Sequence, residues 1–245
     1  MEKLKKYLEN INDVEGWCVP ELWNCIQPIH EFQEANNIDG PIAEIGVHHG
    51  KFFIGLALTK ANFNDHCGID LFDLQMFNSD SSGLGSLSKF KENLELSKVS
   101  SYEAISADSM CITDQFIDER KNKYSLFSVD AGHTVEHTIN DFILAQKMVK
   151  KEGVIFIDDY GNANWPGVQE GIAKYYFFNS SNFVPLLYTC NKLFVCNISY
   201  HKLYLDYTHD FLLKNYPTSR VKEVIRYGHK SLTIRPNIKL KKFLI

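Results

Sequence analysis

The chain has 245 residues, and this length favours one enlarged α/β domain over two separate domains. Hydrophobic residues make up 44%, aromatic residues 13% and charged residues 23% of the chain, which excludes disordered, collagen-like and repeat proteins. No apolar run approaches the roughly 20 residues that span a bilayer, and the first residues are polar and charged. We therefore expect neither a membrane span nor an export signal.

The cysteines show neither C-x-x-C spacing nor companion histidines, so a disulfide framework and a zinc site are both disfavoured. We expect reduced thiols in a cytoplasmic protein. The six residues are Cys18, Cys25, Cys67, Cys111, Cys190 and Cys196.

The net charge of −4 is unevenly distributed along the chain. Eight basic residues and one acidic residue, Glu223, lie between Arg220 and the last residue, so the first 219 residues carry −11. The basic end is interpreted as a solvated strand and helix face. The alternative is a surface that meets nucleic acid, lipid or an acidic partner subunit.

The first 40 residues are predicted to be helical, because apolar residues recur there at spacings of three and four. Short apolar runs then begin near residues 41, 67, 102, 124 and 153, and helix-length segments such as 52–60, 86–96 and 137–149 separate them. A helix over 168–178 and strands over 184–189 and 193–197 follow.

This alternation predicts a doubly wound α/β fold, with a mostly parallel, seven-stranded sheet and helices on both faces. We divide the chain into an N-terminal helical segment (1–40), a core (41–200) and a basic C-terminal extension (201–245). The polar stretch 77–87 is a long loop, and in a compact domain such a loop is usually functional.

The first predicted strand ends in EIGVHHG, which contains Glu44, Gly46 and Gly50. Ligands of such sheets lie beyond the carboxyl ends of the strands, where glycines let the backbone approach a ligand at a helix N-terminus. A nicotinamide dinucleotide would require glycine where His48 stands, so that cofactor is disfavoured. Glycines at this spacing also occur in purely structural turns.

Acidic residues end the next two predicted strands. Asp70 follows the glycine turn by about 20 residues, where a carboxylate can accept hydrogen bonds from both hydroxyls of a ribose. Asp108 and Ser109 end the third strand, a position from which a side chain can bond an adenine edge. Asp108 alone could instead be a helix cap.

Together these residues resemble the class I S-adenosylmethionine-dependent methyltransferases, over roughly residues 40 to 198. Glu44, Gly46 and Gly50 are similar to the first motif of that family, with His48 in place of its middle glycine. The resemblance implies that the core 41–200 binds S-adenosylmethionine, with His48 in the binding turn, Asp70 on the ribose and Asp108 beside the adenine amino group.

Three segments carry a narrower resemblance, to the macrocin and novobiocin type of sugar O-methyltransferases and their polysaccharide-cluster relatives. They are DLFDLQMFN, VDAGHTVEHTINDF and IFIDDYGNANWPGVQEGI. The resemblance implies that Asp130, Asp158 and Asp159 are ligands of a divalent metal, and it includes His133, whose role varies among those proteins.

The residues themselves support a metal. Asp130 closes the fourth predicted strand, and Asp158 and Asp159 close the fifth, so three carboxylates converge on one rim of the sheet. Clustered carboxylates repel one another unless a cation neutralises them, and Mg²⁺ or Mn²⁺ fits such oxygen ligands with positions left for substrate. The alternative is that one of the pair caps a loop and no metal binds.

His133 lies three residues after Asp130. An imidazole there can remove the proton of a hydroxyl that a metal has made more acidic, and Asp130 is the other candidate base. His133 could equally be a hydrogen-bonding residue behind the reacting groups, or it could hold the loop closed. His137 is interpreted as structural. His48 and His49 either contact the methionine portion or the substrate, or pack.

The sequence therefore predicts an S-adenosylmethionine-dependent O-methyltransferase that acts on a sugar hydroxyl, with Tyr160 and Trp165 as stacking surfaces for the acceptor. A nucleotide-linked sugar or a cell-surface polysaccharide precursor is the expected acceptor. The alternatives are a phenolic or catechol-like acceptor, or a catalytically silent partner protein with the same fold. Nucleic acid is disfavoured because most of the chain is acidic. A homodimer is left open.

Overall fold

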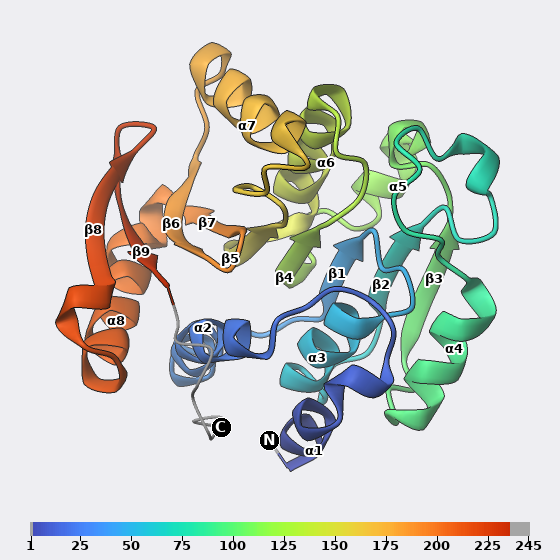
Figure 1. Cartoon of the computed structure of the whole chain (residues 1–245), viewed down its shortest axis with the longest axis horizontal. Coiled ribbons are helices and arrows are strands. Elements are labelled where there is room, and N and C mark those ends of the chain that lie inside the picture. The colour runs from blue at the N-terminus through green and yellow to red at the C-terminus, as the bar shows by residue number, and fades with distance from the viewer. Residues whose placement is uncertain (1, 236–245) are drawn as a thin grey trace.

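The computed structural model describes residues 2–235 as one nine-stranded sheet with helices on both faces (Figure 1). The strand order is β3-β2-β1-β4-β5-β7-β6-β9-β8. The first five strands of this order are parallel, and β7 is antiparallel to both of its neighbours. The strands are β1 Ile42–Ile45, β2 His66–Asp70, β3 Tyr102–Ser106, β4 Tyr124–Val129, β5 Val149–Ile157, β6 Phe183–Thr189, β7 Lys192–Asn197, β8 Val221–Arg226 and β9 His229–Ile234.

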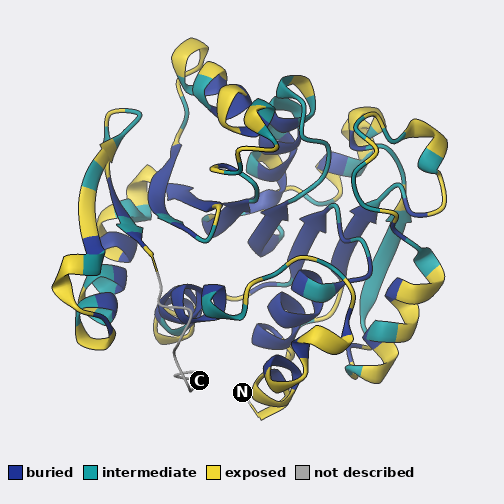
Figure 2. Cartoon of the chain, viewed as in Figure 1, coloured by how far each residue is buried: buried dark blue, intermediate teal, exposed yellow. Residues whose placement is uncertain are grey.

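Two apolar clusters fill the space between the sheet and its helices, one on each face. Helices α1 to α4 and α8 contribute to the first cluster, and α5, α6 and α7 contribute to the second. Figure 2 shows the central strands as the most continuously buried part of the molecule. The helices are α1 Glu2–Glu9, α2 Trp23–Ala35, α3 Lys51–Thr59, α4 Leu87–Leu96, α5 Asp114–Asp118, α6 Val135–Met148, α7 Pro166–Phe178 and α8 Ile198–Asn215.

The predicted fold class is confirmed, because each of the seven predicted strands and each of the predicted core helices lies within a few residues of its expected position. In residues 2–235, no helix is long and apolar enough to cross a membrane.

The sheet is larger than predicted because the C-terminal region adds β8 and β9. Strand β9 runs parallel to β6 and buries Leu232 and Ile234, whereas β8 lies at the edge with Lys222 and Glu223 exposed. Tyr227 and Gly228, both with positive φ, join the two strands, as a tight hairpin requires. Part of the basic extension, residues 236–245 with Lys239, Lys241 and Lys242, lies outside the described residues.

The order of the strands reverses at β1, which lies between β2 and β4. In an open α/β sheet, this reversal leaves a crevice beyond the carboxyl ends of the strands. Gly46 lies at this point with a φ of 88°, and a Cβ there would lie 1.7 Å from the carbonyl oxygen of Asp130. A side chain at position 46 would therefore push the turn after β1 away from the end of β4.

Candidate active site

A cavity of about 690 Å³ opens at the carboxyl edge of the sheet, a size suited to a small-molecule site. Its walls come from the segment 15–19, the turn after β1, the loop after β2, and the ends of β3, β4 and β5. All of the residues predicted to bind the cofactor or the metal or to act as the base line this cavity, with the exception of Gly50. Gly50 instead is the N-cap residue of α3, with a φ of 89°, and a Cβ there would contact the ring of Phe90.

The carboxylate of Asp70 is held by two backbone N–H groups. One oxygen accepts a hydrogen bond of 2.7 Å from the amide of His48, and the other accepts one of 2.6 Å from the amide of Phe72. Burial raises the pKa of Asp70, and these two bonds oppose the rise. His48 has a φ of 49°, so it adopts at this position the left-handed conformation that glycine favours.

Glu44 is a buried carboxylate with 1% of its surface exposed. Among the described residues, neither of its carboxylate oxygens has a partner at ordinary hydrogen-bond geometry, although the hydroxyl of Ser128 lies near enough to lower its pKa. Burial raises the pKa of Glu44 to about 8, although the nearby charge of Lys192 opposes the rise. An unpartnered acidic group that lines a cavity is suited to a positively charged or hydrogen-bond-donating ligand.

The residues that follow β3 cap a short helix and also line the cavity. Asp108 accepts a hydrogen bond of 2.9 Å from the amide of Met110, and so caps the short 3₁₀ helix η4, Ser109–Cys111. The backbone oxygen of Ser109 accepts a hydrogen bond from Asn140 on α6. Asp108 is therefore a helix cap, which was the alternative considered for it from the sequence. It also lines the cavity.

At the ends of β4 and β5, Asp130 and Asp158 face a buried lysine. The Nζ atom of Lys192, on β7, forms an ion pair with Asp158 and lies 3.6 Å from Asp130. Burial and the neighbouring Asp158 raise the pKa of Asp130 well above its usual value. For Lys192, burial lowers the pKa, but the two carboxylates outweigh this effect and raise it.

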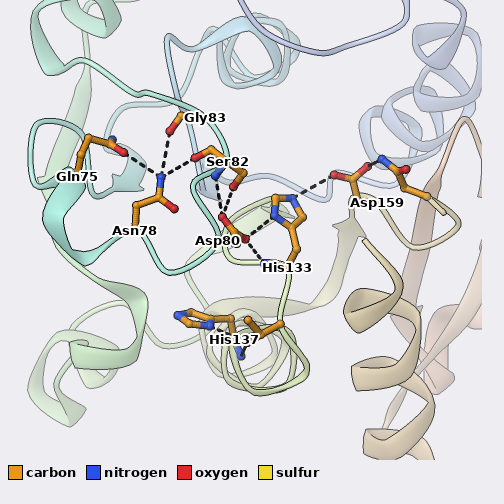
Figure 3. Close-up of polar contacts among 10 residues, drawn as sticks. Gln75, Asn78, Asp80, Ser82, Gly83, His133, His137 and Asp159 are labelled. Carbon is orange, nitrogen blue, oxygen red and sulfur yellow. Dashed lines mark hydrogen bonds and ion pairs between the residues drawn. The ribbon is translucent and has the colours of Figure 1, made fainter. Parts of the chain in front are cut away.

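His133 lies between two other carboxylates (Figure 3). Its Nδ1 atom is 2.7 Å from Asp80, which also accepts a hydrogen bond from the backbone amide of His133, and its Nε2 atom is 3.2 Å from Asp159. The ring stacks on Trp165, with centroids 4.1 Å apart and planes at 17°. Burial alone would lower the pKa of His133, but the bonds to Asp159 and Asp80 raise it.

The long loop after β2 has internal order that presents Asp80 to His133. The side-chain nitrogen of Asn78 donates hydrogen bonds to the backbone oxygens of Ser82 and Gly83 (Figure 3). The carboxylate of Asp80 accepts hydrogen bonds from the backbone N–H and the side-chain hydroxyl of Ser82. The pKa of Asp80 is well below its usual range because the bonds to Ser82 and His133 outweigh burial. The loop thus carries an ionised carboxylate across the cavity.

Asp130, His133 and Asp159 form a group that could hold a metal ion. Their candidate ligand atoms all lie within 4.8 Å of one another. Asp159 has a φ of 53°, and its side chain accepts a hydrogen bond of 2.7 Å from Asn162. The sequence predicted Asp158 as a third carboxylate ligand, but in the structure its side chain is paired with Lys192.

Sequence reasoning missed two contributors to the cavity, the segment 15–19 and Lys192. It expected the loop that carries Asp80 to be functional, but not the contact between Asp80 and His133. A lysine at the start of an apolar strand was the one available signal for Lys192. The expectation that Tyr160 offers a stacking surface is wrong. Its side chain is 5% exposed, it lies outside the cavity wall, and its hydroxyl is hydrogen-bonded to Tyr227.

The cavity, the glycine turn and the acidic strand ends define a class of α/β protein that binds a nucleoside-containing cofactor at the reversal point of the sheet. Residues 43–160 match the family model described as a methyltransferase domain. No curated protein matches the chain in sequence. Residues 43–160 therefore correspond to a methyltransferase domain, in agreement with the resemblance that the sequence predicted.

Solved methyltransferase structures share the fold. CalS11, a TDP-rhamnose 3′-O-methyltransferase of calicheamicin biosynthesis, is 16% identical with a TM-score of 0.52, over 80% of this chain and 92% of that chain. The O-methyltransferase NovP is 14% identical with a TM-score of 0.54, over 78% and 79%. A putative caffeoyl-CoA O-methyltransferase from Staphylococcus aureus is 16% identical with a TM-score of 0.51, over 79% and 90%.

The buried carboxyl of Glu44 leads to a prediction about pH and stability. Its pKa is about 8 in the folded protein and near 4.5 when exposed, so the folded state binds the proton more tightly. Stability that this group contributes is fully present below the lower value and is lost as the pH rises through the higher one. Glu44→Gln should therefore gain stability relative to the natural protein between about pH 5 and about pH 8.5.

Urea unfolding of both proteins across this pH range measures the difference. Glu95→Gln, on an exposed position of α4, is the control for loss of one negative charge and should show no such trend. A difference between Glu44→Gln and the natural protein that stays constant with pH would contradict the prediction.

Proposed function

We propose that the protein transfers the methyl group of S-adenosylmethionine to a hydroxyl of a sugar, with the help of a divalent metal. The observation that carries the proposal is that one cavity joins two groups of residues. The glycine turn with Asp70 and Asp108 suits the cofactor, and Asp130, His133 and Asp159 suit a hydroxyl acceptor. CalS11, which shares the fold, methylates a hydroxyl of TDP-rhamnose, and this supports a sugar as the acceptor.

The cofactor half of the proposal assigns Asp70 to the ribose hydroxyls and Asp108 with Ser109 to the adenine edge. The backbone bonds that hold Asp70 fix the direction of its carboxylate before any ligand binds, which lowers the cost of binding. Glu44 would accept hydrogen bonds from the ammonium group of the methionine portion, because it is acidic, buried and unpartnered among the described residues. His48 and Gly46 form the backbone turn between these groups.

The proposed metal ligands are Asp130 and Asp159, with Mg²⁺ or Mn²⁺ as the ion. Magnesium is usually held by one or two carboxylates and keeps its other positions for water and substrate oxygens, so these two residues fit it. When bound, the ion would make an acceptor hydroxyl more acidic. Neighbouring hydroxyls of a sugar would offer it a pair of oxygens.

In the neutral form with Nδ1 protonated toward Asp80, His133 has one lone pair, at Nε2, on the side of the ring that faces Asp159. This lone pair can bind a metal or accept a proton but cannot do both at once. We assign it to the proton. Asp80 and Asp159 flank the ring and stabilise the imidazolium that forms when His133 accepts a proton, consistent with its raised pKa. The acceptor oxygen then forms a bond to the methyl carbon as the C–S bond of the sulfonium breaks, which gives a methyl ether and S-adenosylhomocysteine.

Trp165 and the loop after β2 are proposed to hold the acceptor. The indole of Trp165 lines the cavity beside His133, and a sugar ring packs well on an aromatic face. A phenolic acceptor is the second candidate, because the chain is as similar in fold to a putative caffeoyl-CoA O-methyltransferase as it is to CalS11. A screen of nucleotide-linked sugars against catechols separates the two.

The first prediction tests the cofactor. Asp70→Ala should weaken binding of S-adenosylhomocysteine by about 10- to 150-fold, because hydrogen bonds to a charged acceptor contribute about 1.5–3 kcal/mol. Isothermal titration calorimetry measures the change. Asp73→Ala, at an exposed position three residues further on, is the matched control and should bind normally. Binding of NAD in place of S-adenosylhomocysteine would overturn the proposed function.

The second prediction tests the metal. Excess chelator should abolish methyl transfer, and Mg²⁺ or Mn²⁺ should restore it, while circular dichroism shows that the fold persists. Asp159→Asn should lose the metal-dependent activity and keep its affinity for S-adenosylhomocysteine. Full activity after dialysis against chelator would indicate a methyltransferase that needs no metal.

The third prediction tests the base and the acceptor. His133→Ala should lower turnover by about 10²- to 10⁴-fold, the usual contribution of a general base, and should leave cofactor affinity unchanged. A loss of turnover in Asp130→Asn but none in His133→Ala would make Asp130 the base. The acceptor screen compares nucleotide-linked sugars with catechols. Methylation of catechols alone would refute the sugar assignment and leave the rest standing.

A further inference from the structure

The position of Lys192 follows from the register of three neighbouring strands. Ile157 on β5 pairs with Leu193 on the antiparallel strand β7. Asp158, which follows Ile157, therefore lies opposite Lys192, which precedes Leu193. Val129 pairs with Ile157, which sets Asp130 beside Asp158 at the ends of β4 and β5.

The turn before β7 holds the lysine at this place. Cys190 and Asn191 connect β6 to β7 with φ values of 47° and 63°, the two positive values that a two-residue hairpin needs. Lys192 is the first residue of β7 and is 2% exposed. Its Nζ atom lies 4.4 Å from the ring centroid of Phe52, a residue of α3 that packs in the core. The ammonium group is therefore a fixed charge on the floor of the cavity.

Asp130 belongs to two groups of residues at once. It lies 3.6 Å from Lys192, and it is also part of the group with His133 and Asp159 that can hold a metal. A divalent ion bound there would experience the positive charge of Lys192 at close range, in a site shielded from bulk water. Asp158 neutralises the charge of Lys192, and its carboxylate is occupied by this ion pair.

We propose that Lys192 is a positioning residue that limits metal affinity: it keeps Asp158 as its own counter-ion, out of the ligand set, and it repels the ion held by Asp130 and Asp159. The inference rests on the metal site of the proposed function. It implies a metal that binds weakly and exchanges readily, with a coordination sphere left open for acceptor oxygens.

The charges define a set of matched variants. Lys192→Met removes the repulsion and frees Asp158, so the variant should bind metal more tightly than the natural protein. The double variant Lys192→Met with Asp158→Asn removes one positive and one negative charge, so its affinity should return to that of the natural protein. Lys192→Arg retains the positive charge and should also resemble the natural protein.

The experiment is a titration of each chelator-stripped protein with Mn²⁺, in which electron paramagnetic resonance measures the free ion. We expect Lys192→Met to bind Mn²⁺ at least about tenfold more tightly, and the double variant to lie within about threefold of the natural protein. A merely structural role for Lys192 would not produce a gain in affinity. Unchanged or weaker binding by Lys192→Met, with S-adenosylhomocysteine binding intact, would overturn the proposal.

The double variant keeps the test decisive if Lys192→Met fails to fold, because it leaves no unpaired charge at this pair. If Asp158 is a metal ligand in the natural protein, the double variant should bind Mn²⁺ more than about tenfold more weakly, and the proposal is then wrong. The proposed function fails separately: tighter Mn²⁺ binding by Lys192→Met in a protein that methylates no hydroxyl would support the role of Lys192 and refute the activity.

Discussion

The alignment of strand ends at one level of the sheet is the constraint on which the cavity depends. The parallel register of β1, β4 and β5 brings Gly46, Asp130 and Asp158 side by side, and the antiparallel β7 adds Lys192 to the row. Hydrogen bonds from the amides of Asp130 and Asp158 to the strands beside them continue the ladder past the strand ends. If the pairing of any of these strands shifted by one residue, the side chain at the end of that strand would point to the opposite face of the sheet.

Charge balance is the second consequence of this alignment. Eight acidic residues line the cavity, among them Glu44, Asp130, Asp158 and Asp159, and a low-dielectric site cannot hold these four ionised without positive charge. Among the described residues, two side chains supply this positive charge. Lys192 pairs with Asp158 and Asp130 on one side, and His133 lies between Asp80 and Asp159 on the other. The two arrangements separate the floor of the cavity from the part that suits an acceptor.

The sequence predicted features that depend on local pattern and missed those that depend on contacts between distant segments. The apolar runs and the helix-length segments between them were enough to predict seven strands. The positions of the strand ends were enough to predict that Asp70 and Asp130 line the site. The contact between Asp80 and His133 joins residues 53 positions apart, and the pair of Lys192 with Asp158 requires the register of antiparallel strands. Neither contact can be predicted from the residues next to it in the sequence. The roles of the site residues remain predictions.

The boundaries of the family match have a consequence for how this active site is specialised. The matched segment, residues 43–160, contains the glycine turn, the acidic strand ends and His133. The cavity also takes the backbone of Gly16, the indole of Trp17 and the ammonium of Lys192 from chain segments on either side of it. A fragment trimmed to residues 43–160 would keep the acidic strand ends and lose one wall of the cavity and the buried positive charge of Lys192. Transplanting those flanking segments onto a related domain is therefore a route to transferring the character of this pocket.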